Sequence, residues 1–376
     1  MPESESSALP QIPLNSRGLV SEAAPLHKDP SWFARNSFPL AILLLALIAF
    51  GNASALRKAI HGSAQPVRPE RTATAPILDD LPVELIQRVP ALMVRGALGN
   101  LSFLVCIGLL IAYAVSAKMR ARVAEFVKPA PARLLPAAGA TDVGISLLVS
   151  LSAGMFLAFM LIPDVPLSMG EHSALVLTLG SAGMLVSCAV LILLSVWRAG
   201  GWHGARGLLP FWTQSVLAPK RTILSDVVLA LGIFALTNGP LLLIGALNKA
   251  LVKGAGMKAD QHSLIGELLM PQPLWVLAAF LVAATYGAAF TEEILFRGGI
   301  YNACRRYMGR WSAALLAGVL FSAVHFIKSD FLPLFAMGLV MTWLYEKTGR
   351  LVASMVFHFT NNLISILTVL ALRGHV

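Results

Sequence analysis

Two glutamates and an arginine lie close together in an otherwise apolar stretch, AAFTEEILFRGGI, at positions 288–300. A charged side chain costs about 2.5–3.5 kcal/mol at the centre of a membrane helix even on permissive scales, so such residues indicate function. Glu293 and Arg297 are four residues apart on a helix and can form a structural ion pair. Glu292 points about 100° away from Glu293, so it does not share the arginine equally. A structural ion pair therefore explains Glu293 and Arg297, whereas Glu292, an extra carboxylate without a local partner, is hard to justify structurally.

Two histidines and an asparagine follow in later apolar segments: His325 in FSAVHF, and His358 and Asn362 in HFTNN. A carboxylate beside a histidine can hold and deprotonate a water, and a second histidine and an amide can stabilise an oxyanion. This set could hydrolyse a carbonyl group such as a peptide bond. Glu292, His325 and His358 could equally bind zinc with an open position for water. Taken singly, each histidine could merely bond a neighbouring helix, as could Asn361 and Asn362.

The composition predicts an all-α protein that crosses a membrane several times. Hydrophobic residues make up 57% of the chain and charged residues only 13%, whereas a soluble domain carries roughly 25% charge. A membrane helix needs about 20 apolar residues. We expect nine spans, or eight, with these bounds: 36–56, 91–117, 144–163, 173–197, 226–249, 274–303, 311–328, 331–346 and 351–372.

The candidate residues are predicted to lie at similar depths in three of these spans. Measured from the predicted cytoplasmic ends at 1.5 Å per residue, Glu292, His325, His358 and Asn362 lie roughly 10–21 Å deep. His358 and Asn362 also share one helix face. Three separate spans would therefore deliver these side chains to one layer, which a random scatter of polar residues does not favour.

The ends and loops indicate how the chain is organised. Residues 1–35 are polar and rich in Ser and Pro, which predicts a disordered cytosolic tail and not a signal peptide. Basic residues gather in the loops 118–133, 198–221, 305–310 and 347–350, so the positive-inside rule places these loops and the N-terminus in the cytoplasm. The basic loop 57–90 conflicts with that orientation. The net charge of +10 therefore reflects topology and does not indicate a nucleic-acid partner.

The motifs Glu292-Glu293-x-x-x-Arg297, Phe321-x-x-x-His325 and His358-x-x-x-Asn362 resemble those of the CAAX prenyl protease and bacteriocin-processing family, also called Abi proteins. The resemblance covers about 224–372 and implies a helical intramembrane endopeptidase core in a bacterial plasma membrane, acting on a membrane-associated or lipidated peptide. It implies that Glu292 and His325 activate water, by a glutamate or a metalloprotease mechanism. The stretch 36–223 would be an additional transmembrane region.

Other classes remain open from the sequence. The chain has no H-E-x-x-H motif, GMKADQ lacks a Gly-x-Gly-Asp pattern, and GSAG misplaces its serine for a nucleophile motif. The three cysteines show no metal-type spacing, and a disulfide framework is not expected. The chain could be a catalytically idle relative that acts as a scaffold or immunity protein. It could also be a transporter, with ALTNGPLLL at 235–243 as a broken helix at the midplane.

Overall fold

The structure is a computed structural model, and it describes residues 89–127, 142–149, 169–199, 201–202, 208–209, 222–256, 268–305, 308–325 and 330–373. These residues contain helices and turns and no strand, which confirms the all-α prediction. The first elements are α4 (Pro90–Val115), α5 (Ala117–Val127), α7 (Met169–Ala199) and α8 (Ile223–Gly254). A long helix then runs through α10 (Leu274–Val282), η3 (Ala283–Gly287), α11 (Ala288–Glu293), η4 (Ile294–Tyr301) and α12 (Asn302–Arg305). The chain continues with α13 (Arg310–Ala323), α14 (Phe331–Thr348) and α15 (Val352–Leu372).

Five helices of the described part are long and apolar enough to cross a membrane: Leu92–Val115, Leu177–Trp197, Ile223–Gly254, Leu274–Arg305 and Val352–Leu372. They coincide with five of the predicted spans, and the chain is an integral membrane protein. The predicted span 36–56 and most of 144–163 lie outside the described residues, as does the tail 1–35. The predicted spans 311–328 and 331–346 correspond to helices of 14 and 18 residues that are not among the five. The count of eight or nine thus stays a prediction.

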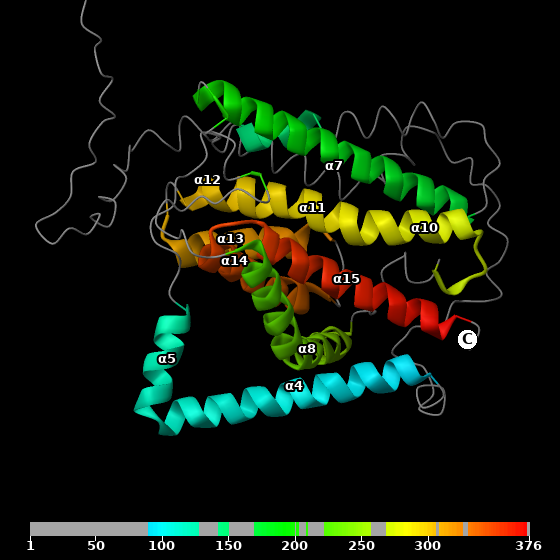
Figure 1. The fold of residues 1–376 in the computed structure, drawn as a ribbon. Helices are drawn as coiled ribbons and strands as arrows, with labels where there is room; N and C mark the ends of the chain where they lie inside the picture. The colour runs from blue at the N-terminus through cyan, green and yellow to red at the C-terminus, as the bar shows by residue number, and fades with distance from the viewer. Residues whose placement is uncertain are drawn as a thin grey trace, which may run out of the picture.

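Most of the long helices lie roughly along one axis, and α8 crosses them (Figure 1). In Figure 1, α7, the α10–α12 helix, α15 and α4 run roughly side by side, and α5 stands across them at one end of the bundle. α13 and α14 pack on each other, α13 also packs on η4, and α14 and α15 both pack on α8. One hydrophobic core joins these helices, and its fully buried members include Ile294, Phe321 and Phe357. The core therefore surrounds the segment that carries the paired glutamates.

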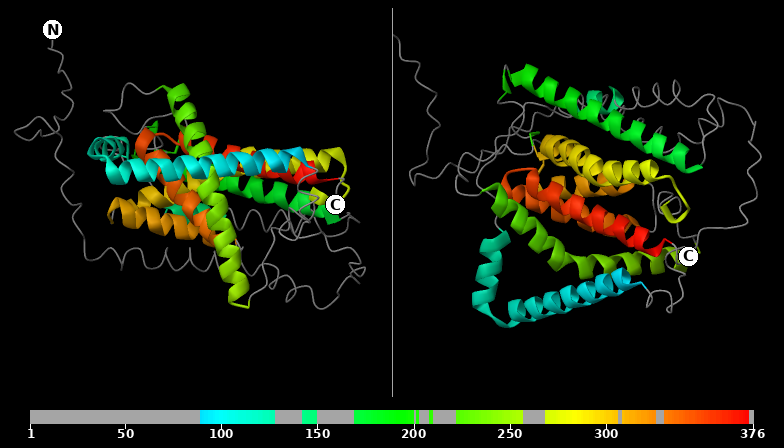
Figure 2. Two further views of the ribbon diagram at one scale, coloured as in Figure 1. Left: turned by 90° about the horizontal axis from the view of Figure 1, so that it is seen from below. Right: turned by 45° about the vertical axis from the view of Figure 1, so that its right-hand side comes forward.

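Helix α8 crosses α4 steeply, at a contact made by two glycines (Figure 2). A Cβ added to Gly239 would lie 2.1 Å from the Gly99 carbonyl oxygen, so the two backbones touch directly. Pro240 follows and has no N–H to donate to the carbonyl of Leu236. Ser102 of α4 donates a 2.6 Å hydrogen bond to that carbonyl oxygen and accepts one of 3.0 Å from the Gly239 N–H. The backbone stays helical throughout 223–254, so the broken helix that the transporter alternative would use at 235–243 is not present.

We expect Gly239→Ala to destabilise the bundle, because the new methyl group would overlap the α4 backbone. Overpacking of this kind typically costs about 1–3 kcal/mol. Gly232→Ala is the matched control, since no atom outside its own helix turn lies within 4 Å of the added Cβ. It should be neutral or stabilising by about 0.5–1 kcal/mol, because alanine favours a helix interior over glycine. Thermal unfolding in one detergent compares the two variants. Equal melting temperatures would contradict the close helix contact.

Candidate active site

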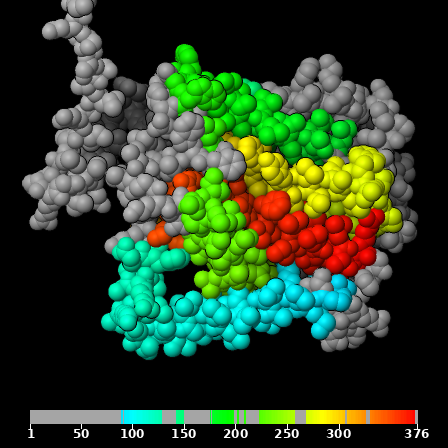
Figure 3. Space-filling view, viewed as in Figure 1, coloured from blue at the N-terminus to red at the C-terminus, as the bar shows by residue number. Residues whose placement is uncertain are grey.

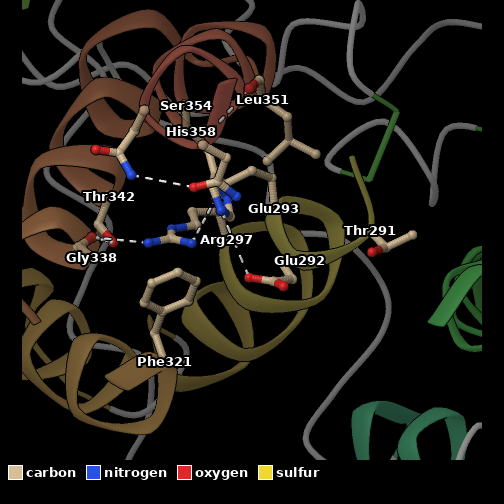
Figure 4. A network of polar contacts seen from close by, with 12 residues as sticks. Thr291, Glu292, Glu293, Arg297, Phe321, Gly338, Thr342, Leu351, Ser354 and His358 are labelled. Carbon is tan, nitrogen blue, oxygen red and sulfur yellow. Dashed lines mark hydrogen bonds and ion pairs between the residues drawn. The ribbon is translucent and has the colours of Figure 1, made fainter. Parts of the chain in front are cut away.

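The paired glutamates lie where a short α-helical segment meets π-helical turns. Glu292 and Glu293 end α11, with η3 before them and η4, which carries Arg297, after them. π-Helical turns inside a longer helix occur frequently at functional sites. The expected single helix over 274–303 is present, but nothing in the pattern of apolar residues predicted its two π-helical segments. Figure 4 shows both glutamates beside His358 of α15, with Arg297 of the same long helix next to Glu293.

Glu293 is fully buried and contacts two side chains. Its Oε1 atom lies 2.8 Å from Arg297 Nη1 and 3.1 Å from His358 Nδ1. The Arg297 side chain also donates a 3.1 Å hydrogen bond to the Gly338 carbonyl oxygen, and its guanidinium lies 4.7 Å from the centre of the Phe321 ring. The predicted ion pair at i, i+4 is present. The second contact, from Glu293 to His358, ties α11 to α15 and was not predicted.

Glu292 faces the two histidines instead. Its Oε2 atom lies 3.9 Å from His325 Nε2 and 3.9 Å from His358 Nε2. These distances exceed a hydrogen bond, and contacts of this length are often bridged by a water. The Oε2 atom is buried, and no hydrogen-bond partner for it occurs among the described residues. The Glu292 side chain as a whole is 19% exposed and that of His325 is 21% exposed, against 2% for His358.

The remaining ring nitrogens show how both imidazoles are oriented. His325 Nδ1 lies 2.7 Å from the Phe321 carbonyl oxygen, and His358 Nδ1 lies 3.1 Å from the carboxylate of Glu293. A carbonyl or carboxylate oxygen only accepts, so each Nδ1 must carry the proton in these bonds. When neutral, both rings therefore present an Nε2 lone pair toward Glu292. The Glu292 Oε2 atom and the two Nε2 atoms are three acceptors that face the same place. Such a place suits a hydrogen-bond donor or a cation.

Asn362 lies one helical turn beyond His358 on α15, but it contacts a different part of the long helix. Its Nδ2 atom donates a 2.8 Å hydrogen bond to the carbonyl oxygen of Ala284, in η3. The neighbouring Asn361 Nδ2 lies 3.2 Å from Asn362 Oδ1, which fixes the orientation of the amide. An amide nitrogen carries two hydrogens, so one remains for another acceptor.

The structure thus brings Glu292, Glu293, Arg297, His325 and His358 into one cluster and places Asn362 at its side. Reasoning from the sequence missed Gly338. A Cβ on this residue would lie 3.3 Å from the Gly318 Cα, a tight contact between α14 and α13, and 3.7 Å from Arg297 Nη2. Spacing gave no signal for it, because Gly338 reaches the cluster from a different helix, 41 residues further along the chain.

The fold and the cluster together define the class of protein. It is a polytopic helical membrane protein with two carboxylates and two histidines enclosed between its helices. Residues 273–364 match the sequence model of the family described as Type II CAAX prenyl endopeptidase Rce1-like. The match confirms the family resemblance of the motifs, and the matched segment contains the whole cluster. It leaves out α8, which the predicted core of 224–372 includes.

One curated relative is the protein named Putative membrane peptidase YdiL of Bacillus subtilis (strain 168). It is 27% identical over 111 residues, which are 30% of this chain and 43% of that protein. The chain therefore matches less than half of the length of this relative. No solved structure matches the chain.

Proposed function

We propose that this protein is a CAAX-type intramembrane endopeptidase that hydrolyses a peptide bond of a membrane-associated or lipidated substrate. The observation that carries the proposal is the Glu292 Oε2 atom. It is buried without a hydrogen-bond partner in the described part of the chain, 3.9 Å from two imidazole nitrogens. Buried polar groups are normally hydrogen-bonded, and the Glu293 carboxylate is held through Oε1 by Arg297 and His358, whereas the Glu292 carboxylate lies 3.9 Å from its nearest charged or imidazole groups.

Charge balance supports a proton held within the cluster. Glu292 and Glu293 contribute −2 and Arg297 contributes +1, which leaves −1 with neutral histidines. An uncompensated charge inside a protein is costly, and one added proton would neutralise it. A mobile proton beside a water is the starting point for general acid–base catalysis.

The proposed reaction uses these groups in order. A water between Glu292 and His325 attacks the scissile carbonyl carbon as Glu292 accepts one of its protons. The carbonyl oxygen becomes an oxyanion, which accepts hydrogen bonds from protonated His358 and from the second amide hydrogen of Asn362. Glu293 holds His358 in place through Nδ1 and balances its charge. Glu292 then returns its proton to the leaving amine as the carbon–nitrogen bond breaks.

Zinc is the alternative way to activate the water. Glu292, His325 and His358 would be the ligands, and the bound metal would act as a Lewis acid. Their ring orientation fits, because histidine ligands usually donate the other ring N–H to a carbonyl or a carboxylate. As the side chains lie, however, the described residues form no group of three His, Cys, Asp or Glu that could hold a metal ion. The steps above therefore use the chain's own residues.

The environment of the reaction follows from the five membrane helices and the family match. We propose a plasma-membrane protein of a bacterium with its N-terminus in the cytoplasm, acting on a peptide that reaches Glu292 from within or beside the bilayer. Residues 36–223 would contribute further membrane helices whose role is docking or regulation. Membrane lipid is the surrounding partner, and no nucleic acid takes part.

A comparison of membrane proteomes tests the function. Cells that express the wild-type chain should contain new peptide termini that are absent from cells expressing Glu292→Ala at the same level. Identical sets of termini would favour the scaffold reading. The peptide found in this way then serves as the assay for purified protein. Activity that survives a chelator in metal-free protein favours the glutamate mechanism, and activity restored by about one equivalent of zinc favours the metal.

A further inference from the structure

Helix α5 turns away from the membrane helix that precedes it. It follows the membrane helix α4 after a single residue, Ser116, whose backbone is extended and whose hydroxyl accepts a hydrogen bond from the Met119 N–H. Arg120 folds back and donates to the carbonyl oxygens of Tyr113 and Ala114, at the end of α4. α5 then runs across the direction of the long helices (Figure 1). A helix turned in this way at the end of a membrane span lies in the plane of the interface.

The α5 side chains are arranged as in interfacial helices. Met119 and Val123, four residues apart, are its half-buried positions, and none of its residues is fully buried. Phe126 packs on Trp343 of α14 at 5.5 Å between ring centres. The helix has three basic residues and one acidic residue, a net charge of +2. Lys118 and Arg122 are exposed, and they form no ion pair within the described residues.

The space beside α5 is bordered by membrane helices and by further interfacial side chains. Figure 3 shows an opening bounded by α4, α5 and α8. Both membrane helices expose large apolar side chains, among them Leu110 of α4 and Val228 of α8. On the α14 side, a cavity of about 40 Å³ is lined by Val127, Arg310, Trp311, Trp343 and Glu346, among others.

Two groups at this cavity suit a polar headgroup. The Trp343 Nε1 atom is buried, and no hydrogen-bond partner for it occurs in the described part of the chain. The Arg310 guanidinium lies 5.0 Å from the centre of the Trp311 ring, and Trp311 is 66% exposed. Tryptophan is enriched at the level of lipid headgroups. The acidic Glu346 in the lining is already hydrogen-bonded by Tyr301 at 2.6 Å.

We infer that α5, with the adjoining ends of α13 and α14, binds an anionic phospholipid. The anionic headgroup lies at the interface that carries Lys118, Arg122 and Arg310, and the acyl chains extend beside α4 and α8. Charge complementarity selects this occupant, because basic residues at the interface attract anionic lipid electrostatically. The inference does not depend on peptidase activity, since it concerns residues outside the glutamate–histidine cluster.

The test measures lipid binding to the full chain in detergent. Phosphatidylglycerol and phosphatidylcholine are titrated in parallel, and bound lipids are counted by native mass spectrometry. We expect retained phosphatidylglycerol and much weaker phosphatidylcholine. Lys118→Gln/Arg122→Gln should weaken phosphatidylglycerol binding by roughly ten- to thirty-fold, because each interfacial basic residue contributes a few-fold. Arg310→Gln should weaken it about five-fold.

Two controls make the result specific. Lys118→Arg/Arg122→Lys keeps the charge at the same positions and should bind as the wild type does. Arg373→Gln removes a charge beyond the end of α15, at the opposite end of the bundle from α5, and should also bind normally. Equal binding of both lipids, unchanged binding by Lys118→Gln/Arg122→Gln, or an equal loss in Arg373→Gln would each overturn the inference.

Discussion

Glu292→Gln should lower the rate of peptide hydrolysis by about 10²–10⁴-fold, the range typical of a lost general base. The amide keeps the shape of the side chain but cannot accept the proton of the attacking water. Folding should change little, because the Glu292 Oε2 atom has no hydrogen-bond partner within the described residues. The measurement is single-turnover cleavage of the identified substrate by purified protein, with the melting temperature recorded on the same sample.

The control for this experiment is Glu346→Gln. Glu346 is also a buried carboxylate of the bundle, but it contacts Tyr301 and lies outside the cluster. We expect it to keep most of the activity. Near-normal turnover by Glu292→Gln would remove Glu292 from the chemistry. A similar loss in both variants would indicate a general effect of removing buried charge.

Glu293→Ala should destabilise the protein by about 3–5 kcal/mol, the usual cost of removing one partner of a buried ion pair. The change leaves Arg297, which is 1% exposed, without its carboxylate and also removes the partner of His358 Nδ1. Arg297 retains only the Gly338 carbonyl oxygen and the face of Phe321. Denaturant unfolding in a fixed detergent measures the loss.

A double-mutant cycle tests the cause. Glu293→Ala with Arg297→Met removes both charges and nearly preserves volume at the arginine, so part of the lost stability should return. If the double variant is as unstable as the sum of the single variants, the two residues are not coupled. Glu293→Gln should be milder than Glu293→Ala, because its amide oxygen can still accept a hydrogen bond from His358.

Residue type and spacing were enough to predict the core of the candidate site. The i, i+4 spacing predicted the Glu293–Arg297 pair, and the 100° offset predicted that Glu292 would face elsewhere. Both depend only on the local helix, which a single segment determines. The five long apolar helices of the described part were also predicted from local sequence. A run of about 20 apolar residues is enough to recognise a membrane helix.

The rest depends on how helices meet. The Glu293–His358 contact joins residues 65 positions apart, so no local pattern predicts it. Gly338 matters only because Arg297 and Gly318 approach it from other helices. The π-helical segments differ from an α-helix by their hydrogen bonds and not by hydrophobicity, so η3 and η4 gave no signal. The catalytic roles, the zinc alternative and the orientation in the membrane stay predictions.

The two contacts between α15 and the long helix also restrict movement. His358 bonds Glu293, and Asn362 bonds the Ala284 carbonyl oxygen about two and a half turns earlier on that helix. Two hydrogen bonds at different positions along the helix axes restrict both sliding and relative rotation of the two helices. A single bond would still allow rotation about it. His325 lies just after α13, and among the described residues its side-chain hydrogen bond is to the Phe321 carbonyl oxygen of that helix, while Glu292 Oε2 lies 3.9 Å from its Nε2 atom. If the space around Glu292 widens to admit a peptide, we therefore expect α13 to move while α15 and the long helix keep their relative position.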